Sequence, residues 1–149
     1  MAQPILEVQI LSGDEDLGLP GYATEGSAGL DLKASLKSPM ILQPGERAII
    51  STGLKLAIPE GYEGCVRPRS GLAAQKGITL TNAPGTIDSD YRGEIKILLI
   101  NLGKEAVTFQ RGDRIAQLVI TPVARVQIVQ VQQLNSTHRG EGGLGHTGI

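Results

Sequence analysis

Two carboxylates that could activate a water molecule stand close together in the stretch "NAPGTIDSDYRGEIKI", residues 82–97. Asp88 and Asp90 are two residues apart, so in an extended chain they share a face, where mutual repulsion raises the proton affinity of one of them. Such a carboxylate can act as a general base if water and an electrophile lie within hydrogen-bond reach. A polar hairpin tip, in which Asp and Gly only satisfy turn geometry, is the alternative.

A second stretch with chemical potential is "RPRSGLAAQKG", residues 67–77. Ser70 as N-cap and Gly77 at the C-terminal end predict a helix of about two turns. The free backbone N–H groups at its start carry a partial positive charge, and Arg67 and Arg69 directly precede them. This arrangement favours an anion site, and an ordinary connecting helix is the alternative.

Other catalytic patterns are missing from the sequence. The two histidines, His138 and His146, both lie in the glycine-rich C-terminal stretch, and no HExxH, CxxC or P-loop pattern occurs. The single Cys65 cannot form an internal disulfide, and we expect an inert strand residue in a reducing compartment. Any catalysis is therefore expected to depend on carboxylates and an anion clamp.

Composition favours one soluble domain with an aliphatic core. The chain has 149 residues, of which 40% are hydrophobic, with one Phe, three Tyr and no Trp. A net charge of −1 gives the protein no overall positive electrostatic field that would attract the phosphates of a polynucleotide, so a nucleic-acid partner is not expected. The N-terminus "MAQPILEVQIL" has no basic lead, and no apolar run approaches the roughly 20 residues of a membrane span. We expect a cytoplasmic protein without a membrane partner.

The elements that must position these residues are predicted to be short strands. Apolar residues recur with a period of two rather than 3.6, and Pro-Gly and Gly-Asp turns separate the runs at short intervals. Many short strands with such turns are typical of a sandwich or barrel. The predicted strands are residues 6–10, 54–58, 93–102, 106–109, 115–123 and 125–131.

Five stretches, taken together, resemble a known family. They are "SAGLDLKAS" (27–35), "RPRSGLA" (67–73), "NAPGTIDSDYRG" (82–93), "RGDRIAQLVI" (111–120) and "RGEGGLGHTG" (139–148). Each is several residues long, and their order and spacing resemble the five motifs of the trimeric dUTP pyrophosphatases (dUTPases).

The resemblance implies an all-β, jelly-roll-like (β-clip) subunit with one short helix, in a homotrimer whose active sites lie between subunits. It divides the chain into a β domain, residues 1–136, and a mobile glycine-rich arm, residues 137–149, which closes an active site of a neighbouring subunit. The implied activity is hydrolysis of dUTP to dUMP and pyrophosphate, with Mg²⁺ on the triphosphate. Such an enzyme limits the dUTP available for DNA synthesis and supplies dUMP for dTMP synthesis.

The third motif carries the implied base, sugar and catalytic residues. Asp88 matches the general base that orients water for attack on the α-phosphorus. The nucleobase of this family sits in a β-hairpin, and its pocket positions match Asn82, Thr86, Ile87 and the backbone around Lys96. In the same motif, the aromatic residue that packs on the deoxyribose and excludes a 2′-hydroxyl matches Tyr91.

The implied phosphate and metal residues lie in the first, second and fourth motifs. Arg69, Ser70 and Gly71 match the triphosphate-binding positions at the start of the short helix, and Gln117 matches a phosphate-contacting glutamine. Asp31 matches an aspartate associated with the water shell of the metal.

The fifth motif matches the family's arm but departs from it at two positions. Arg139 matches the arginine that meets the γ-phosphate. Leu144 stands where many relatives have an aromatic that stacks on uracil, and His146 stands where they have Ser. Leucine can cover the base by apolar contact but lacks ring stacking.

Two other functions compete with this interpretation. The dCTP deaminases resemble this fold, although the "GTIDSDYRG" stretch and the complete glycine-rich arm favour hydrolysis alone. A nucleotide sensor without turnover is the non-enzymatic alternative, and the presence of Asp88 beside a complete set of arginines speaks against it.

Overall fold

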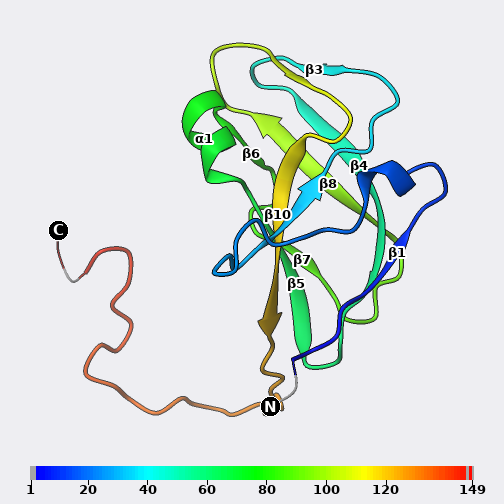
Figure 1. Cartoon of the computed structure of the whole chain (residues 1–149). Helices are drawn as coiled ribbons and strands as arrows, with labels where there is room; N and C mark the ends of the chain where they lie inside the picture. Colours follow the sequence, from blue (N-terminus) through cyan, green and yellow to red (C-terminus); the bar gives the residue numbers. More distant parts are fainter. Residues whose placement is uncertain (1–2, 147, 149) are drawn as a thin grey trace.

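The computed structural model describes residues 3–146 and 148 of the chain. Met1, Ala2, Thr147 and Ile149 lie outside the described residues, and Thr147 belongs to the last of the five motifs. Two four-stranded antiparallel sheets, one two-stranded ribbon and one short α-helix make up the described fold (Figure 1). The predicted all-β class with a single short helix is confirmed.

The first sheet has the strand order β1-β4-β8-β6. Its alternating pattern is clearest on β8, where Ile95, Ile97 and Leu99 are buried and Lys96 between them is exposed. This is the period-two pattern of a half-buried strand. The strands are β1 (Glu7–Ile10), β4 (Arg47–Ala57), β8 (Glu94–Asn101) and β6 (Ile78–Leu80).

The second sheet has the order β2-β10-β5-β7, which makes β2 and β7 its opposite edges. These strands are β2 (Leu30–Lys33), β10 (Arg114–Pro122), β5 (Tyr62–Arg67) and β7 (Gly85–Ile87). The ribbon pairs β3 (Met40–Leu42) with β9 (Val107–Phe109), and a 3-10 turn, η1 (Glu15–Leu17), follows β1.

Aliphatic side chains from both sheets form one core. Leu32, Leu99 and Leu118 are fully buried in it, and Phe109 is the one aromatic among the buried core residues of the described chain. Cys65 on β5 is also buried, as its place in an apolar strand predicts. The composition therefore leads to a core built by branched aliphatic packing rather than by rings.

The helix α1 (Ser70–Lys76) begins differently from the prediction. Ser70 is its first helical residue, whereas Arg69 occupies the N-cap position with an extended backbone and makes no side-chain capping bond. The predicted N-cap was therefore wrong by one residue. Gly77 ends the helix as predicted, with a left-handed backbone (φ +69°) and its N–H donating to Ala73 O.

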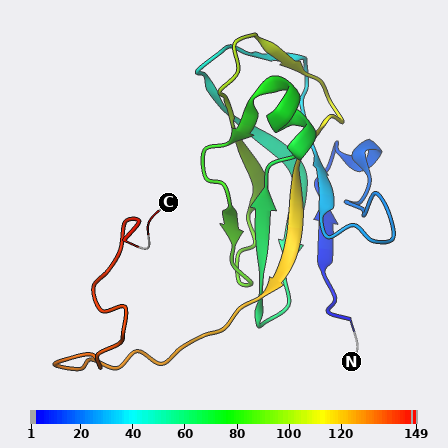
Figure 2. The same ribbon diagram turned by 90° about the vertical axis from the view of Figure 1, so that its left-hand side faces the viewer.

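The chain beyond β10 leaves the packed body. Residues 123–146 contain no strand or helix, and Figures 1 and 2 show them running away from the sheets. The prediction of a strand over residues 125–131 was wrong for the single chain, which has no strand there. Its apolar side chains Val126, Ile128 and Val129 are exposed because no described strand lies beside them to pair with. No helix in the described part of the chain combines the length and the apolar character needed to cross a bilayer.

Candidate active site

A cavity of about 270 Å³ lies between β7 and β8 and collects most of the residues predicted for the base and sugar. Val66, Leu80, Ile95 and Ile97 form its apolar lining, while Glu94 and Leu98 complete the β8 side. Its predicted residues are Asn82, Thr86, Ile87, Asp88, Tyr91 and Lys96.

The cavity exists because β7 and β8 do not pair with each other. β7 pairs with β5 in one sheet, whereas β8 pairs with β4 and β6 in the other, so the predicted β-hairpin was wrong. On the β6 side of β8 the ladder covers only residues 99–101, and Leu98 C=O accepts Thr81 N–H at 3.0 Å. Backbone groups alternate between the two edges of a strand, so Lys96 N–H and C=O point to the same side as those of Leu98. There they have no ladder partner in the described residues.

The turn before β7 brings an amide to this open edge. Asn82 lies close to Gly85, and a Cβ atom at Gly85 would stand 3.0 Å from Asn82 Nδ2. Glycine at that position therefore leaves room for the amide beside the first residue of β7. Together with the free backbone of Lys96, the amide offers both donors and acceptors to a planar polar ligand.

Asp88 directly follows β7 and stands exposed at the rim of the cavity. The next residues form a turn in which Tyr91 N–H donates to Asp88 O at 3.1 Å. Because the chain is not extended here, the premise that Asp88 and Asp90 share one face was wrong. Asp88 lines the cavity and Asp90 does not.

Tyr91 reaches the cavity by folding back over its own loop. Its hydroxyl donates to Glu94 O at 3.1 Å, and a Cβ atom at Gly93 would overlap that hydroxyl. The side chain thus needs glycine at position 93 to take this path. The ring lines the cavity and remains about half exposed, which leaves one side accessible to a ligand.

A second cavity, of about 250 Å³, gathers the predicted phosphate residues at the start of α1. Strand register explains why separate motifs meet there: on β10, Gln117 lies opposite Asp31 of β2 on one side and Arg67 of β5 on the other. Gln117 Nε2 also donates to Pro68 O at 2.9 Å, just before the helix. The predicted residues in this cavity are Asp31, Arg69, Ser70, Gly71 and Gln117.

Asp31 holds two guanidinium groups in this second cavity. Its Oδ1 lies 3.4 Å from Arg69 Nε, and its Oδ2 lies 3.2 Å from Arg114 Nη1. Arg69 also donates to Arg114 O at 3.2 Å. Two arginines beside a helix start make this cavity suitable for an anion with several negative charges.

The carboxylates of the described residues do not form a metal cage. No group of three or more His, Cys, Asp or Glu side chains there has the geometry to hold an ion. Both oxygens of Asp31 are already paired with arginines, Oδ2 by a hydrogen bond from Arg114 and Oδ1 by the ion pair with Arg69, so direct ligation by Asp31 does not fit. A contact through water does fit, because a carboxylate has about four lone-pair positions.

The two cavities share no lining residue, and they lie toward opposite edges of the second sheet, marked by β7 and β2. The predicted arm residues line neither of them in the described chain. Arg139 Nε donates to Gly142 O within the arm at 2.8 Å, Leu144 is fully exposed, and the His146 ring lies against Gly142. A single chain therefore assembles the predicted residues into three separate groups.

The sequence prediction left out two charged side chains that line these cavities, Glu94 and Arg114. Glu94 follows the glycine that ends the third motif, and Arg114 is within the fourth motif. Their charge and their place in the motifs were the only signals available. Their partners, Gly53 for Glu94 and Asp31 for Arg114, lie 41 and 83 residues away and are brought close only by the fold.

Comparison with known proteins agrees with this geometry. The dUTPase family model matches residues 15–148. A deoxyuridine 5'-triphosphate nucleotidohydrolase of Thermoanaerobacter sp. strain X514 is 56% identical over 145 residues, which is 97% of this chain and 98% of that protein. One from Aquifex aeolicus is 59% identical over 128 residues, covering 86% and 85%.

Solved structures give the same result for the fold. A mutant dUTPase of Staphylococcus bacteriophage 80alpha with dUpNHpp has a TM-score of 0.83 at 28% identity, and the match covers 97% of this chain and 99% of that one. A mutant dUTPase from phage phi11 of S. aureus, which coordinates a structural Mg(II) ion, has a TM-score of 0.78 at 26% identity over 89% and 99%. The match of motifs, fold and nearly full-length sequence shows that this chain belongs to the dUTPase family.

Proposed function

We propose that this protein hydrolyses dUTP to dUMP and pyrophosphate by attack of water on the α-phosphorus, with Asp88 as general base. The observation that carries the proposal is the cavity between β7 and β8, where Asp88 stands at the rim beside an open polar strand edge. Membership of the dUTPase family supports the same substrate. The role that follows is to limit dUTP for DNA synthesis and to supply dUMP for dTMP synthesis, in the cytoplasm.

Uracil suits the open edge of β8. Its ring offers an N–H donor between two carbonyl acceptors, so it can pair with Lys96 backbone groups and with the Asn82 amide. Cytosine presents an acceptor where uracil presents that donor, and would leave a buried group unpaired. Thr86 and the buried Ile87 limit the space on the β7 side, which disfavours the methyl group of thymine.

Tyr91 is proposed to pack on the deoxyribose. Its ring lines the cavity within one short loop of Asp88, so the sugar and the α-phosphorus of one nucleotide can reach both side chains. A 2′-hydroxyl would need space that the ring occupies. This position accounts for a preference for dUTP over UTP.

The second cavity is proposed to bind the triphosphate. Arg69 supplies positive charge, Ser70 and Gly71 supply the first N–H groups of α1, and the Gln117 amide completes the polar lining. We propose that Mg²⁺ is bound by the triphosphate itself, and that Asp31 faces its water shell. When bound, the ion neutralises phosphate charge.

Asp88 is proposed to take a proton from the attacking water. Its exposed carboxylate at the cavity rim is open to solvent, and the backbone bond from Tyr91 N–H holds the turn that carries it. The arginines and helix start hold the phosphates in line for displacement, which is the main requirement of phosphoryl transfer.

A homotrimer is proposed because one chain leaves the site in three groups. In a trimer, the second cavity of one subunit and the arm of residues 137–149 of another can meet the β7–β8 cavity of a third. The exposed apolar side chains Val126, Ile128, Val129 and Val131 support this, since a partner sheet would bury them. In the assembled site, Arg139 meets the γ-phosphate, and Leu144 and His146 cover the nucleotide.

The test is release of pyrophosphate from dUTP, dCTP, dTTP and UTP, measured in parallel with Mg²⁺. We expect rapid release from dUTP alone. Ammonia release from dCTP would instead favour a deaminase, and tight dUTP binding without turnover would favour a sensor. Either of these results, in the absence of pyrophosphate release from dUTP, contradicts the proposal.

A further inference from the structure

We propose that Glu94 is a positioning residue for Tyr91, and that its carboxylate thereby sets the preference for deoxyribose over ribose. The inference rests on the proposed function, in which Tyr91 packs on the sugar. Three sets of contacts support it: those within the loop that carries Tyr91, those of the Glu94 carboxylate, and those that hold its partner on β4.

The loop between β7 and β8 is closed on itself. Among the described residues, the hydrogen bonds of residues 89–93 begin and end within residues 88–94: Tyr91 N–H to Asp88 O, Arg92 Nη1 to Ser89 O and Tyr91 O, and Tyr91 hydroxyl to Glu94 O. These bonds fix the shape of the loop but not its placement over the cavity. The placement depends on the two ends of the loop, at Asp88 after β7 and at Glu94 where the loop joins β8.

The Glu94 side chain joins this point to β4. Oε1 accepts from Gly53 N–H at 3.1 Å, and Oε2 accepts from Ser51 hydroxyl at 3.4 Å. The regular ladder between β4 and β8 shifts register between Ser51 and Lys55, where a bulge interrupts it. The carboxylate thus bridges the irregular part of the ladder at the start of β8, where the Glu94 backbone pairs with Lys55 and the Thr52 hydroxyl donates to Ile95 O at 2.6 Å. Backbone Glu94 O, which receives the Tyr91 hydroxyl, belongs to the same residue.

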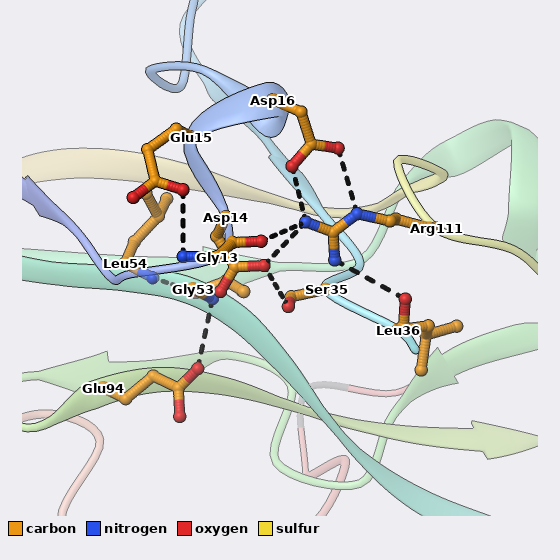
Figure 3. A network of polar contacts seen from close by, with 11 residues as sticks. Gly13, Asp14, Glu15, Asp16, Ser35, Leu36, Gly53, Leu54, Glu94 and Arg111 are labelled. Atoms are coloured by element: carbon orange, nitrogen blue, oxygen red, sulfur yellow. Dashed lines mark hydrogen bonds and ion pairs between the residues drawn. The ribbon is translucent and has the colours of Figure 1, made fainter. Parts of the chain in front are cut away.

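Asp14 packs against Gly53 on the side that faces away from Glu94, as Figure 3 shows. Gly53 has a left-handed backbone (φ +69°), and a Cβ atom there would overlap the Asp14 carboxyl group. Asp14 Oδ1 accepts from Ser35 hydroxyl at 2.5 Å and from Arg111 Nη2 at 2.9 Å. The donor that faces Glu94 therefore stands on a bulge that the packing and charge of another part of the chain keep in place.

Removal of the carboxylate should release the loop while leaving the chemistry intact. We expect Glu94→Ala to lower the kcat/KM preference for dUTP over UTP by about tenfold, equivalent to about 1.4 kcal/mol, as the loss of one charge-assisted hydrogen bond implies. The KM for dUTP should rise by a larger factor than kcat falls, because Asp88 directly follows β7, which pairs with β5 and not with β8. Glu94→Gln keeps an oxygen acceptor for Gly53 N–H but not the charge, so it should retain more of the preference than Glu94→Ala.

The experiment measures kcat and KM for dUTP and UTP in the wild type, Glu94→Ala, Glu94→Gln, Tyr91→Phe and the double variant Glu94→Ala/Tyr91→Phe. If Glu94 acts through Tyr91, the losses of preference in the two single variants do not add in the double variant. The matched control is Glu46→Ala, which removes a similar bond from Gln43 N–H (2.9 Å) in a turn outside both cavities, and it should keep the wild-type preference.

Three results would each overturn the inference: losses of preference that add in the double variant, an unchanged preference in Glu94→Ala, or a loss in Glu94→Gln as large as the loss in Glu94→Ala. If Glu94→Ala does not fold, Glu94→Asp replaces it in the experiment. The aspartate side chain is shorter by one methylene and cannot reach Gly53 N–H, so we expect the same loss of preference for dUTP over UTP. A wild-type protein that does not hydrolyse dUTP would refute the proposed function itself, which distinguishes the two failures.

Discussion

Replacement of Asp88 by Asn tests the proposed general base with little disturbance of the fold. Asparagine has nearly the shape of aspartate but cannot take a proton from water. Asp88 is exposed, and the bond that holds its turn runs from Tyr91 N–H to the backbone oxygen of Asp88, not to its side chain. We therefore expect the free energy of unfolding to change by no more than about 0.5 kcal/mol.

The expected loss of turnover is much larger than this change in stability. A positioned general base contributes about 10²–10⁴ in rate, which corresponds to roughly 2.7–5.5 kcal/mol of the barrier. The residues that bind the base, Asn82 and Lys96, and those of the second cavity remain unchanged. Asp88→Asn should therefore lower kcat and kcat/KM together by about 10³ and leave the KM for dUTP nearly unchanged.

The assay is steady-state pyrophosphate release from dUTP, with thermal unfolding of each variant as a check on folding. Asp90→Asn is the matched control, because Asp90 lies two residues further along the same exposed turn but outside the cavity lining. It should keep nearly full activity. The reasoning is refuted if Asp88→Asn retains more than about a hundredth of wild-type kcat, since a general base supplies a factor of at least about 10², or if Asp90→Asn loses as much.

Three further predictions concern the arm, the core and pH. Truncation after Ser136 should leave the melting temperature unchanged, since the core and the side chains packed against it lie within residues 6–120, and should abolish dUTP turnover; full turnover would mean that the arm is only a tail. Asn101→Ala should lower the free energy of unfolding by about 3 kcal/mol in urea titration, because the buried amide makes three hydrogen bonds, and a loss below about 1 kcal/mol would contradict this. The side-chain bonds from Arg111 lower the pKa of Asp16, so its stabilising contribution is present above about pH 4 and is lost as the pH falls through the lowered pKa. Asp16→Asn should therefore lower the melting temperature at pH 7, with the difference closing in strong acid; an equal difference at both pH values would contradict the assignment.

Local patterns predicted the regular elements well where burial on one face follows directly from the sequence. The alternating residues of β8 and β10 form strands close to the predicted bounds, and Gly77 ends the helix as its conformational freedom predicts. Predictions that needed a neighbouring element were less successful. Residues 125–131 alternate like a strand, but a strand forms only where another strand supplies hydrogen bonds, and the described single chain has none beside them.

The sequence by itself determined the residue types of the candidate site, their order in five motifs and the aliphatic, β-rich character of the chain. It did not determine which strands pair. Residues 82–97 read as one hairpin, yet β7 and β8 join different sheets, and this separation opens the cavity beside Asp88. Likewise, the pairing of Asp31 with Arg69 and Arg114, and of Glu94 with Gly53, depends on strand register across dozens of residues. Side-chain periodicity is a local property of the backbone, whereas register and cavities result from how distant strands share one core, and only the tertiary structure decides that.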